Sequence, residues 1–203
     1  MTLPRNKIIF VDIDGPMIPA KAVLMPGNGG PDCWNWNFDI FAVRALNFAY
    51  FCDPDVRLVL SSHRWGEDGL FHTSPYPEYR DLRQKEFWVR LFEENGVAVP
   101  FHDDWITPRH MVLGNRYFKR SKYIEIMEWR QKHPEVKHFV SLEDDLNGGN
   151  EVFDYMKKHT HLICEDYEDG MTFADFRKML MYLGLNPSTD KYREFNDNAL
   201  AFA

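Results

Sequence analysis

Short apolar runs alternate along the chain with longer amphipathic stretches. Five apolar runs rich in β-branched and aromatic residues predict buried strands, at residues 7–11, 57–60, 97–101, 138–142 and 161–164. Five stretches with helical periodicity predict helices, at residues 38–51, 78–95, 121–131, 151–158 and 172–183. This alternation predicts an α/β fold in which helices cover both faces of a central parallel sheet.

Turn-rich segments set the domain organisation. Residues 15–37 are rich in proline and glycine and follow the first predicted strand, and residues 65–78 follow the second. Long loops inside a compact domain are usually functional, so both are expected to lie near a site. The length and composition suit one domain over residues 1–185, followed by a polar C-terminal arm at residues 186–203.

The charge balance limits the kinds of partner. Of 203 residues, 24 are Lys or Arg and 31 are Asp or Glu, so the formal net charge is −7, and the chain has no long basic run. Extended nucleic-acid binding is therefore disfavoured. No run approaches the roughly 18 apolar residues of a membrane span, and no secretory signal is apparent. With widely spaced cysteines as well, we expect a cytoplasmic protein with reduced thiols and no membrane association.

Two carboxylates follow the first predicted strand. Asp12 and Asp14 lie two residues apart, so in extended backbone their side chains point to the same side, and Gly15 frees the turn that follows. Two carboxylates this close together are rarely both ionised unless a cation lies beside them. The pair therefore predicts a site for a hard divalent metal, most simply Mg²⁺. A solvated acidic turn is the alternative interpretation.

Other polar residues follow the neighbouring strands. The second predicted strand ends at Ser-Ser-His-Arg, residues 61–64, and the fourth at three consecutive acids, residues 143–145. Ligands bind at the carboxyl ends of the strands in an open parallel sheet, so these groups are expected to share one site. Residues 102–104, His-Asp-Asp, look like a second metal cluster, but consecutive residues point in different directions. A turn or cap network is the favoured interpretation there.

Four segments resemble, in order, the motifs of haloacid dehalogenase-like (HAD) phosphotransferases. They are KIIFVDIDGPM at 7–17, LVLSSHRW at 58–65, KYIEIMEW at 122–129 and FVSLEDD at 139–145. The chain is most similar to a capless subgroup with a Ser-Ser-x-Trp-Arg-like second motif, an Asp-Trp-x-Thr-Pro segment and a Lys…Glu-Ile-x-x-Trp helix. This resemblance implies a three-layer Rossmann-like fold with strand order 5-4-1-2-3. It implies no large cap domain, because the insertions at 15–37 and 65–78 are too short for one.

The resemblance also implies catalytic roles for four residues. Asp12 would be the nucleophile that forms an aspartyl-phosphate, and Asp14 the general acid and base. Ser61 would donate a hydrogen bond to the transferring phosphoryl group, and Lys122 would neutralise its charge. Ser62 is the alternative to Ser61 at the motif position, and Ser61 is preferred because it directly follows the apolar run.

Metal and substrate residues follow from the same resemblance. The implied Mg²⁺ ligands are acidic residues from the first and fourth motifs: Asp12, Asp14 through its backbone carbonyl, Asp144 and Glu143. Ser62 and Arg64 are the candidate substrate-binding residues, and a guanidinium suits a phosphate or carboxylate. For Arg64, a structural ion pair is an equal alternative.

The activity implied is Mg²⁺-dependent hydrolysis of a phosphomonoester through an aspartyl-phosphate. The expected substrate is small and phosphorylated, either a nucleotide or another phosphometabolite. The enzymatic alternatives are a phosphotransferase and a polynucleotide-end phosphatase, the latter weakened by the acidic charge. The non-enzymatic alternatives are a receiver-like signalling domain and a degenerate phosphate-binding module.

Overall fold

The computed structural model describes residues 7–25, 28, 37–61, 84–108, 111–112, 119–120, 122–144, 159–164 and 168–199. Within these residues, seven strands are formed: β1 (Lys7–Val11), β2 (Val56–Leu60), β3 (Phe101–Ile106), β4 (Met111–Val112), β5 (Lys119–Arg120), β6 (His138–Glu143) and β7 (Leu162–Cys164). The described helices are η1 (Ala20–Leu24), α1 (Ile40–Cys52), α2 (Lys85–Glu94), α3 (Lys122–Lys132), α5 (Phe173–Tyr182) and α6 (Thr189–Ala199).

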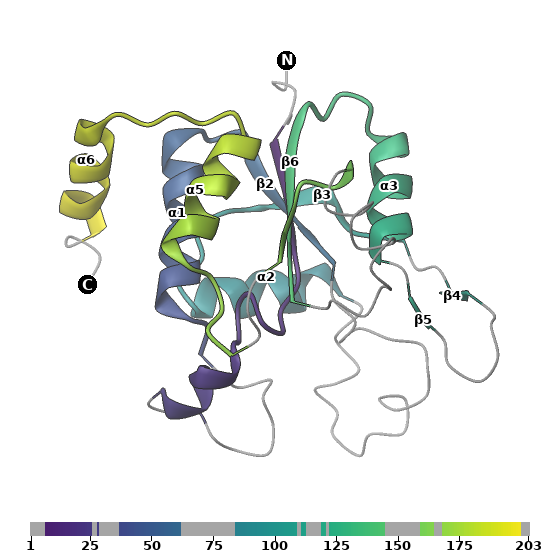
Figure 1. The fold of residues 1–203 in the computed structure, drawn as a ribbon, viewed down its shortest axis with the longest axis horizontal. Helices are drawn as coiled ribbons and strands as arrows, with labels where there is room; N and C mark the ends of the chain where they lie inside the picture. The colour runs from purple at the N-terminus through teal and green to yellow at the C-terminus, as the bar shows by residue number, and fades with distance from the viewer. Residues whose placement is uncertain are drawn as a thin grey trace.

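The main sheet is parallel, with the first strand at its centre. Its order among the described strands is β3-β2-β1-β6-β7, and β1 pairs in parallel with both β2 and β6 (Figure 1). This is the predicted order of 5-4-1-2-3, so the α/β fold class and the strand order are confirmed. Val11 pairs with Leu60 on one side and Leu142 on the other, so the three strands end within one residue of the same level.

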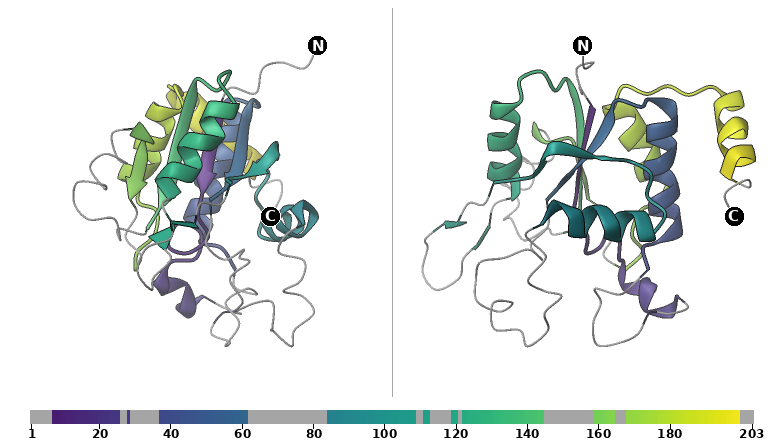
Figure 2. Two further views of the ribbon diagram at one scale, coloured as in Figure 1. Left: turned by 90° about the vertical axis from the view of Figure 1, so that its right-hand side faces the viewer. Right: turned by 180° about the vertical axis from the view of Figure 1, so that it is seen from behind.

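Helices cover both faces of this sheet. Side chains alternate along β1: Ile9 and Val11 join a core that includes residues of α1, α2 and α5, whereas Ile8 and Phe10 pack with Trp129 of α3 on the other face. Figure 2 shows the same arrangement from two further sides, with α1 and α5 across the sheet from α3. Burial on both faces explains why β1 reads as a continuous apolar run.

The third strand begins later than the sequence predicted. The prediction was residues 97–101, but β3 spans Phe101–Ile106. Val97 and Val99 are buried without belonging to a strand. Pro100 has no N–H to donate to the neighbouring strand β2. Only its carbonyl bonds to β2, accepting from Leu58 N at 3.0 Å. Residues 102–104 were expected to follow the strand and instead lie inside it.

Three of the helix predictions agree with the structure, whereas α2 begins only at Lys85, after an extended Gln84 that the prediction of 78–95 had placed in the helix. α1 begins after Asp39, whose carboxylate accepts from Phe41 N and Ala42 N, and α5 begins after Thr172, which forms a capping box with Asp175. α3 lies within one residue of the predicted 121–131. The prediction at 151–158, most of the 15–37 loop beyond residue 25, and the 65–78 insertion lie outside the described residues.

A helix also forms in the segment predicted as a polar arm. α6 packs against α1 through aromatic rings: Tyr192 stacks on Phe48 with centroids 4.5 Å apart, and Phe195 lies edge-on to Phe48 at 5.2 Å. These two aromatics are three residues apart on one face of an otherwise polar sequence. None of the described helices is long and apolar enough to cross a membrane.

Candidate active site

The carboxyl ends of β1, β2 and β6 bring the predicted residues together. Asp12 follows β1, and its N–H donates to Leu142 O at 3.1 Å; Ser61 follows β2, and its N–H donates to Val11 O at 2.9 Å. Glu143 is the last residue of β6. These backbone hydrogen bonds extend the parallel ladder by one residue, so the side chains that follow the strands are held at one edge of the sheet.

A buried ammonium lies between two buried carboxylates. Lys122, the first residue of α3, donates from Nζ to Asp12 Oδ2 and, at 2.6 Å, to Glu143 Oε1. The three side chains are 4–5% exposed. Asp12 also accepts from the N–H of Ile13 through its other oxygen, at 2.8 Å. The sequence prediction that joined Lys122 to the first and fourth motifs thus corresponds to direct contact.

The charges of this cluster perturb one another strongly. Burial by itself would lower the pKa of Lys122, but the charges of Asp12 and Glu143 outweigh it and raise the pKa above its ordinary value. Burial, and then the charge of Asp12, raises the pKa of Glu143 well above its usual range. One ammonium therefore does not compensate all the acidic groups gathered here, and the site favours a further cation.

Asp144 completes a set of three carboxylates. Asp12, Glu143 and Asp144 each offer one oxygen, and these oxygens lie within 4.8 Å of one another. Burial, followed by the charge of Asp12, raises the pKa of Asp144 to about 6. A set of carboxylate oxygens with excess negative charge fits Mg²⁺, which takes oxygen ligands and keeps positions for water and phosphate. Both predicted fourth-motif ligands thus lie in this cluster.

Asp14 lies in the tight turn that follows Asp12. It is partly buried and forms a one-residue bridge with Ile18, while the N–H of Gly15 donates to Ile18 O at 3.2 Å. Gly15 has φ of +74°, and a Cβ there would lie 2.3 Å from the Cβ of Asp144. Only glycine fits this close approach, so the turn after β1 and the acid after β6 need Gly15 between them.

Ser61 presents a buried hydroxyl with no hydrogen-bond partner among the described residues. The residue is 2% exposed, and its backbone is fixed by the bond to Val11 O. A buried polar atom left unpaired costs free energy and calls for an explanation. A phosphoryl oxygen bound at the sheet edge would accept from this hydroxyl. The other two predicted substrate residues, Ser62 and Arg64, lie outside the described part of the chain.

A contact between Thr107 and Glu125 was not predicted. Thr107 is fully buried; its N–H donates to Leu60 O at 3.0 Å and its hydroxyl to Glu125 Oε2 at 3.4 Å. Glu125 is 1% exposed and lies three residues after Lys122 on α3. The contact therefore links the end of β2, where Ser61 lies, to the helix that carries Lys122. Thr107 belongs to the Asp-Trp-x-Thr-Pro segment at 104–108 and Glu125 to the segment at 122–129, but nothing in their spacing joins them.

Comparison with known proteins adds little to this geometry. No family model and no curated protein matches the chain. Among solved structures, the HAD domain of the effector protein Lem4 from Legionella pneumophila is similar, with 16% sequence identity over 88% of this chain and 95% of that chain and a TM-score of 0.46. A likeness of this extent carries no weight for activity or substrate, so the function has to come from the residues of the site.

Proposed function

We propose that the chain is a Mg²⁺-dependent phosphomonoester hydrolase of the HAD-like type, acting on a small phosphorylated molecule such as a nucleotide. The observation that carries this proposal is the buried group of Asp12, Lys122 and Glu143, joined by Asp144, at the carboxyl ends of β1 and β6. Burying so many charges is costly, and a catalytic site is the usual reason to maintain them.

Asp12 is the proposed nucleophile. One of its carboxylate oxygens attacks phosphorus and forms the aspartyl-phosphate while the bond from phosphorus to the ester oxygen breaks. Asp14 gives its proton to the departing oxygen and then takes one from the water that hydrolyses the phosphoenzyme. A Mg²⁺ ion held by Asp12, Glu143 and Asp144 would supply positive charge beside the phosphoryl oxygens.

Lys122 and Ser61 are the proposed phosphoryl-binding groups. Without substrate, the ammonium of Lys122 is shared between Asp12 and Glu143. When a phosphoryl group arrives, Lys122 keeps Glu143 and transfers its other hydrogen bond from Asp12 to a phosphoryl oxygen, which frees Asp12 to attack. The unpaired hydroxyl of Ser61 donates to a second phosphoryl oxygen.

The test is hydrolysis of p-nitrophenyl phosphate and of a panel of nucleotides, with Mg²⁺ and with EDTA. We expect release only with Mg²⁺, none from Asp12→Asn, and wild-type release from Asp190→Asn, whose side chain is 79% exposed on α6. Asp14→Asn should accumulate phosphoenzyme or turn over far more slowly. Wild-type rates in Asp12→Asn, or calorimetry that detects no Mg²⁺ binding, would contradict the proposal.

A further inference from the structure

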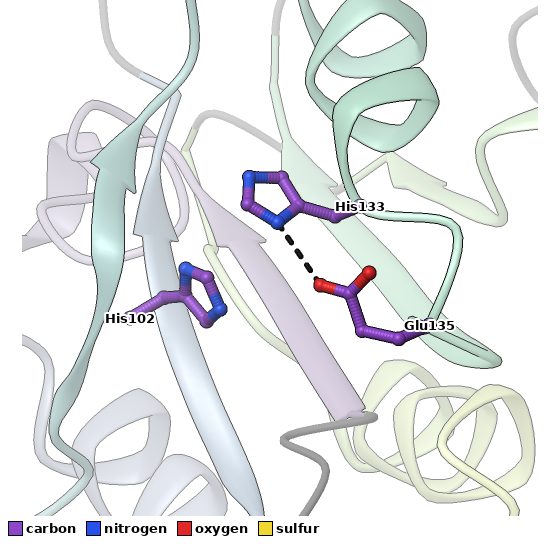
Figure 3. Close-up of side chains that lie close together, drawn as sticks. All are labelled: His102, His133 and Glu135. Carbon is purple, nitrogen blue, oxygen red and sulfur yellow. Dashed lines mark hydrogen bonds and ion pairs between the residues drawn. The ribbon is translucent and has the colours of Figure 1, made fainter.

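A second set of metal-ligating side chains lies at the opposite end of α3. His133 directly follows the last residue of α3, Glu135 lies two residues further on, and His102 comes from β3. Figure 3 shows the three side chains turned toward one another. Each offers one ligand atom, and these atoms lie within 4.8 Å of one another.

This set is separate from the Asp12 cluster. α3 begins at Lys122 and has 11 residues, so its two ends lie about 15 Å apart at the usual rise per residue. His102 is the second residue of β3, near the level of Leu58 in the middle of β2, whereas Ser61 follows the last residue of β2. The two groups therefore lie at different levels along the strands.

His133 is oriented as metal-bound histidines usually are. Its ring stacks on Trp129, with centroids 3.9 Å apart and planes at 26°. Nε2 lies 2.9 Å from Asp104 Oδ2, and Nδ1 lies 3.1 Å from Glu135 Oε1. A ligating histidine typically donates its other ring N–H to a carboxylate, the position that Asp104 holds. The 3.1 Å between Nδ1 and Oε1 suits two atoms that bind one ion at about 2.0–2.2 Å each.

His102 supplies the third ligand from a buried position. The residue is 7% exposed, and its ring lies edge-on to Trp129 at 5.1 Å and to His133 at 5.0 Å. Its Nδ1 accepts the backbone N–H of Asp104 at 3.1 Å. This hydrogen bond has to break before the ring can bind a metal. While it is present, Nδ1 is occupied by the Asp104 N–H, and Nε2 carries the proton of the neutral ring. Metal binding is therefore coupled to a change at the Asp104 amide.

We propose that His102, His133 and Glu135 form a binding site for a divalent transition metal of the Zn²⁺ type, distinct from the proposed Mg²⁺ site. Two imidazoles and one carboxylate suit Zn²⁺, Cu²⁺ or Ni²⁺, whereas Mg²⁺ takes oxygen ligands. The side chains of Glu135 and Asp104 are 45% and 47% exposed, which leaves an entry path and a fourth position for water. The ion would link β3 to the segment that follows α3.

Binding of the ion to His133 exchanges a proton for the metal. Both nitrogens of His133 lie beside carboxylate oxygens, and both hydrogen bonds form only when both nitrogens carry protons. The incoming ion replaces the proton on Nδ1, while Nε2–H continues to donate to Asp104. The displaced proton passes to the solvent, so the exchange of proton for metal ion balances.

The test is calorimetric titration of the full chain with Zn²⁺ in excess Mg²⁺, supported by the visible absorption of the Co²⁺ form. We expect one equivalent to bind in the wild type and in Asp12→Asn. His133→Gln should weaken binding at least about 100-fold, and Asp104→Asn, which leaves all three ligands in place, about 10–100-fold. His138 is exposed at the start of β6, so His138→Gln is the matched control and should bind Zn²⁺ as the wild type does.

Glu135→Gln keeps the proposal testable if a histidine variant fails to fold, because Glu135 is exposed. Zn²⁺ should raise the unfolding midpoint of the wild type and much less that of Glu135→Gln. Absence of Zn²⁺ binding in the wild type, or wild-type binding in both His133→Gln and Glu135→Gln, would overturn the proposal. Loss of Zn²⁺ binding in Asp12→Asn would assign the ion to the other site. None of these readouts depends on phosphatase activity.

Discussion

The two ends of α3 carry similar charges in opposite surroundings. At the first end, Lys122 and its two carboxylates are no more than 5% exposed; at the other, the carboxylates around His133 are nearly half exposed. A buried ion that loses its partner keeps its full desolvation penalty, whereas an exposed ion is stabilised by water. The same kind of contact therefore has a large energetic weight at one end and a small one at the other.

The ligand atoms differ in the same way. The buried end gathers carboxylate oxygens around one ammonium, which suits hard cations and phosphoryl transfer. The exposed end adds imidazole nitrogens, which suit softer ions. One helix thus separates two proposed sites whose ligand atoms favour different metals, and the following variants test how complete that separation is.

Lys122→Met should have the largest effect on stability. It leaves Asp12 and Glu143 buried side by side without their ammonium, a loss of about 3–5 kcal/mol in the free energy of unfolding with EDTA at neutral pH. Urea unfolding measures it, with Lys132→Met at the exposed end of α3 as the control. A loss no greater than that of the control would mean that the two carboxylates do not depend on Lys122.

Thr107→Val should have the next largest effect. It removes the hydroxyl that donates to buried Glu125 and should cost about 1–3 kcal/mol in the free energy of unfolding. If this contact sets the distance between Lys122 and Ser61, kcat should fall about tenfold or more in Thr107→Val, with a smaller change in KM. Thr107→Ser, which keeps the hydroxyl, should restore most of the activity. Equal activity in Thr107→Val and the wild type would show that the contact is structural only.

Asp144→Asn should stabilise the metal-free protein by about 1 kcal/mol at neutral pH, after allowance for the solvent screening of a partly exposed group. Burial and Asp12 raise the pKa of Asp144 to about 6 in the folded state, so between about pH 4 and pH 6 the unfolded chain loses this proton first. This acid therefore lowers stability as the pH rises through that window, and the penalty persists above it.

The check is thermal unfolding of wild type and Asp144→Asn in EDTA across that pH window. The difference between them should shrink toward the acidic end and vanish below the window, where Asp144 is protonated in both states. Mg²⁺ should stabilise the wild type more than the variant. A variant that is less stable than the wild type at neutral pH without metal would reverse the assigned sign.

Glu135→Gln should have the smallest effect in the absence of metal. Its carboxylate is 45% exposed, and a solvent-exposed contact of this kind contributes about 0.5 kcal/mol or less to stability. Urea unfolding in EDTA should give nearly the same midpoint for the variant and the wild type. A loss of several kcal/mol would mean that the two ends of α3 do not differ as their exposure indicates.

Elements that rest on local pattern were predictable from the sequence. The apolar run before Asp12 and the acids after residue 142 both fall at strand ends, so the Asp12 and Glu143 positions followed from pattern together with the order of parallel strands. Ser61 is buried directly after β2, as its position after the apolar run indicates, while Ser62 lies outside the described residues. Each of these inferences needed only one strand and the residue after it.

Features that depend on packing were not predictable. Pro100 delays β3 because its missing N–H matters only once β2 is alongside. α6 is stabilised because Tyr192 and Phe195 pack against Phe48 of α1. The polar sequence of this segment does not predict that contact. In the sequence, the neighbours of His102 are Asp103 and Asp104, whereas the side chains that could bind a metal with it, His133 and Glu135, follow α3. In each case the partner lies far away in the sequence.

The central position of β1 also has a consequence for the time course of folding. Lys7 pairs with His138, and the rest of β1 pairs with β6 in the same register, so one side of the first strand stays open until a strand from the last third of the chain arrives. Contacts this distant in sequence are slow to form. An intermediate built from β1, β2 and β3 would hold Asp12 and Ser61 but would lack Lys122 and Glu143. We therefore expect the protein to acquire its complete acidic cluster only at the final stage of folding.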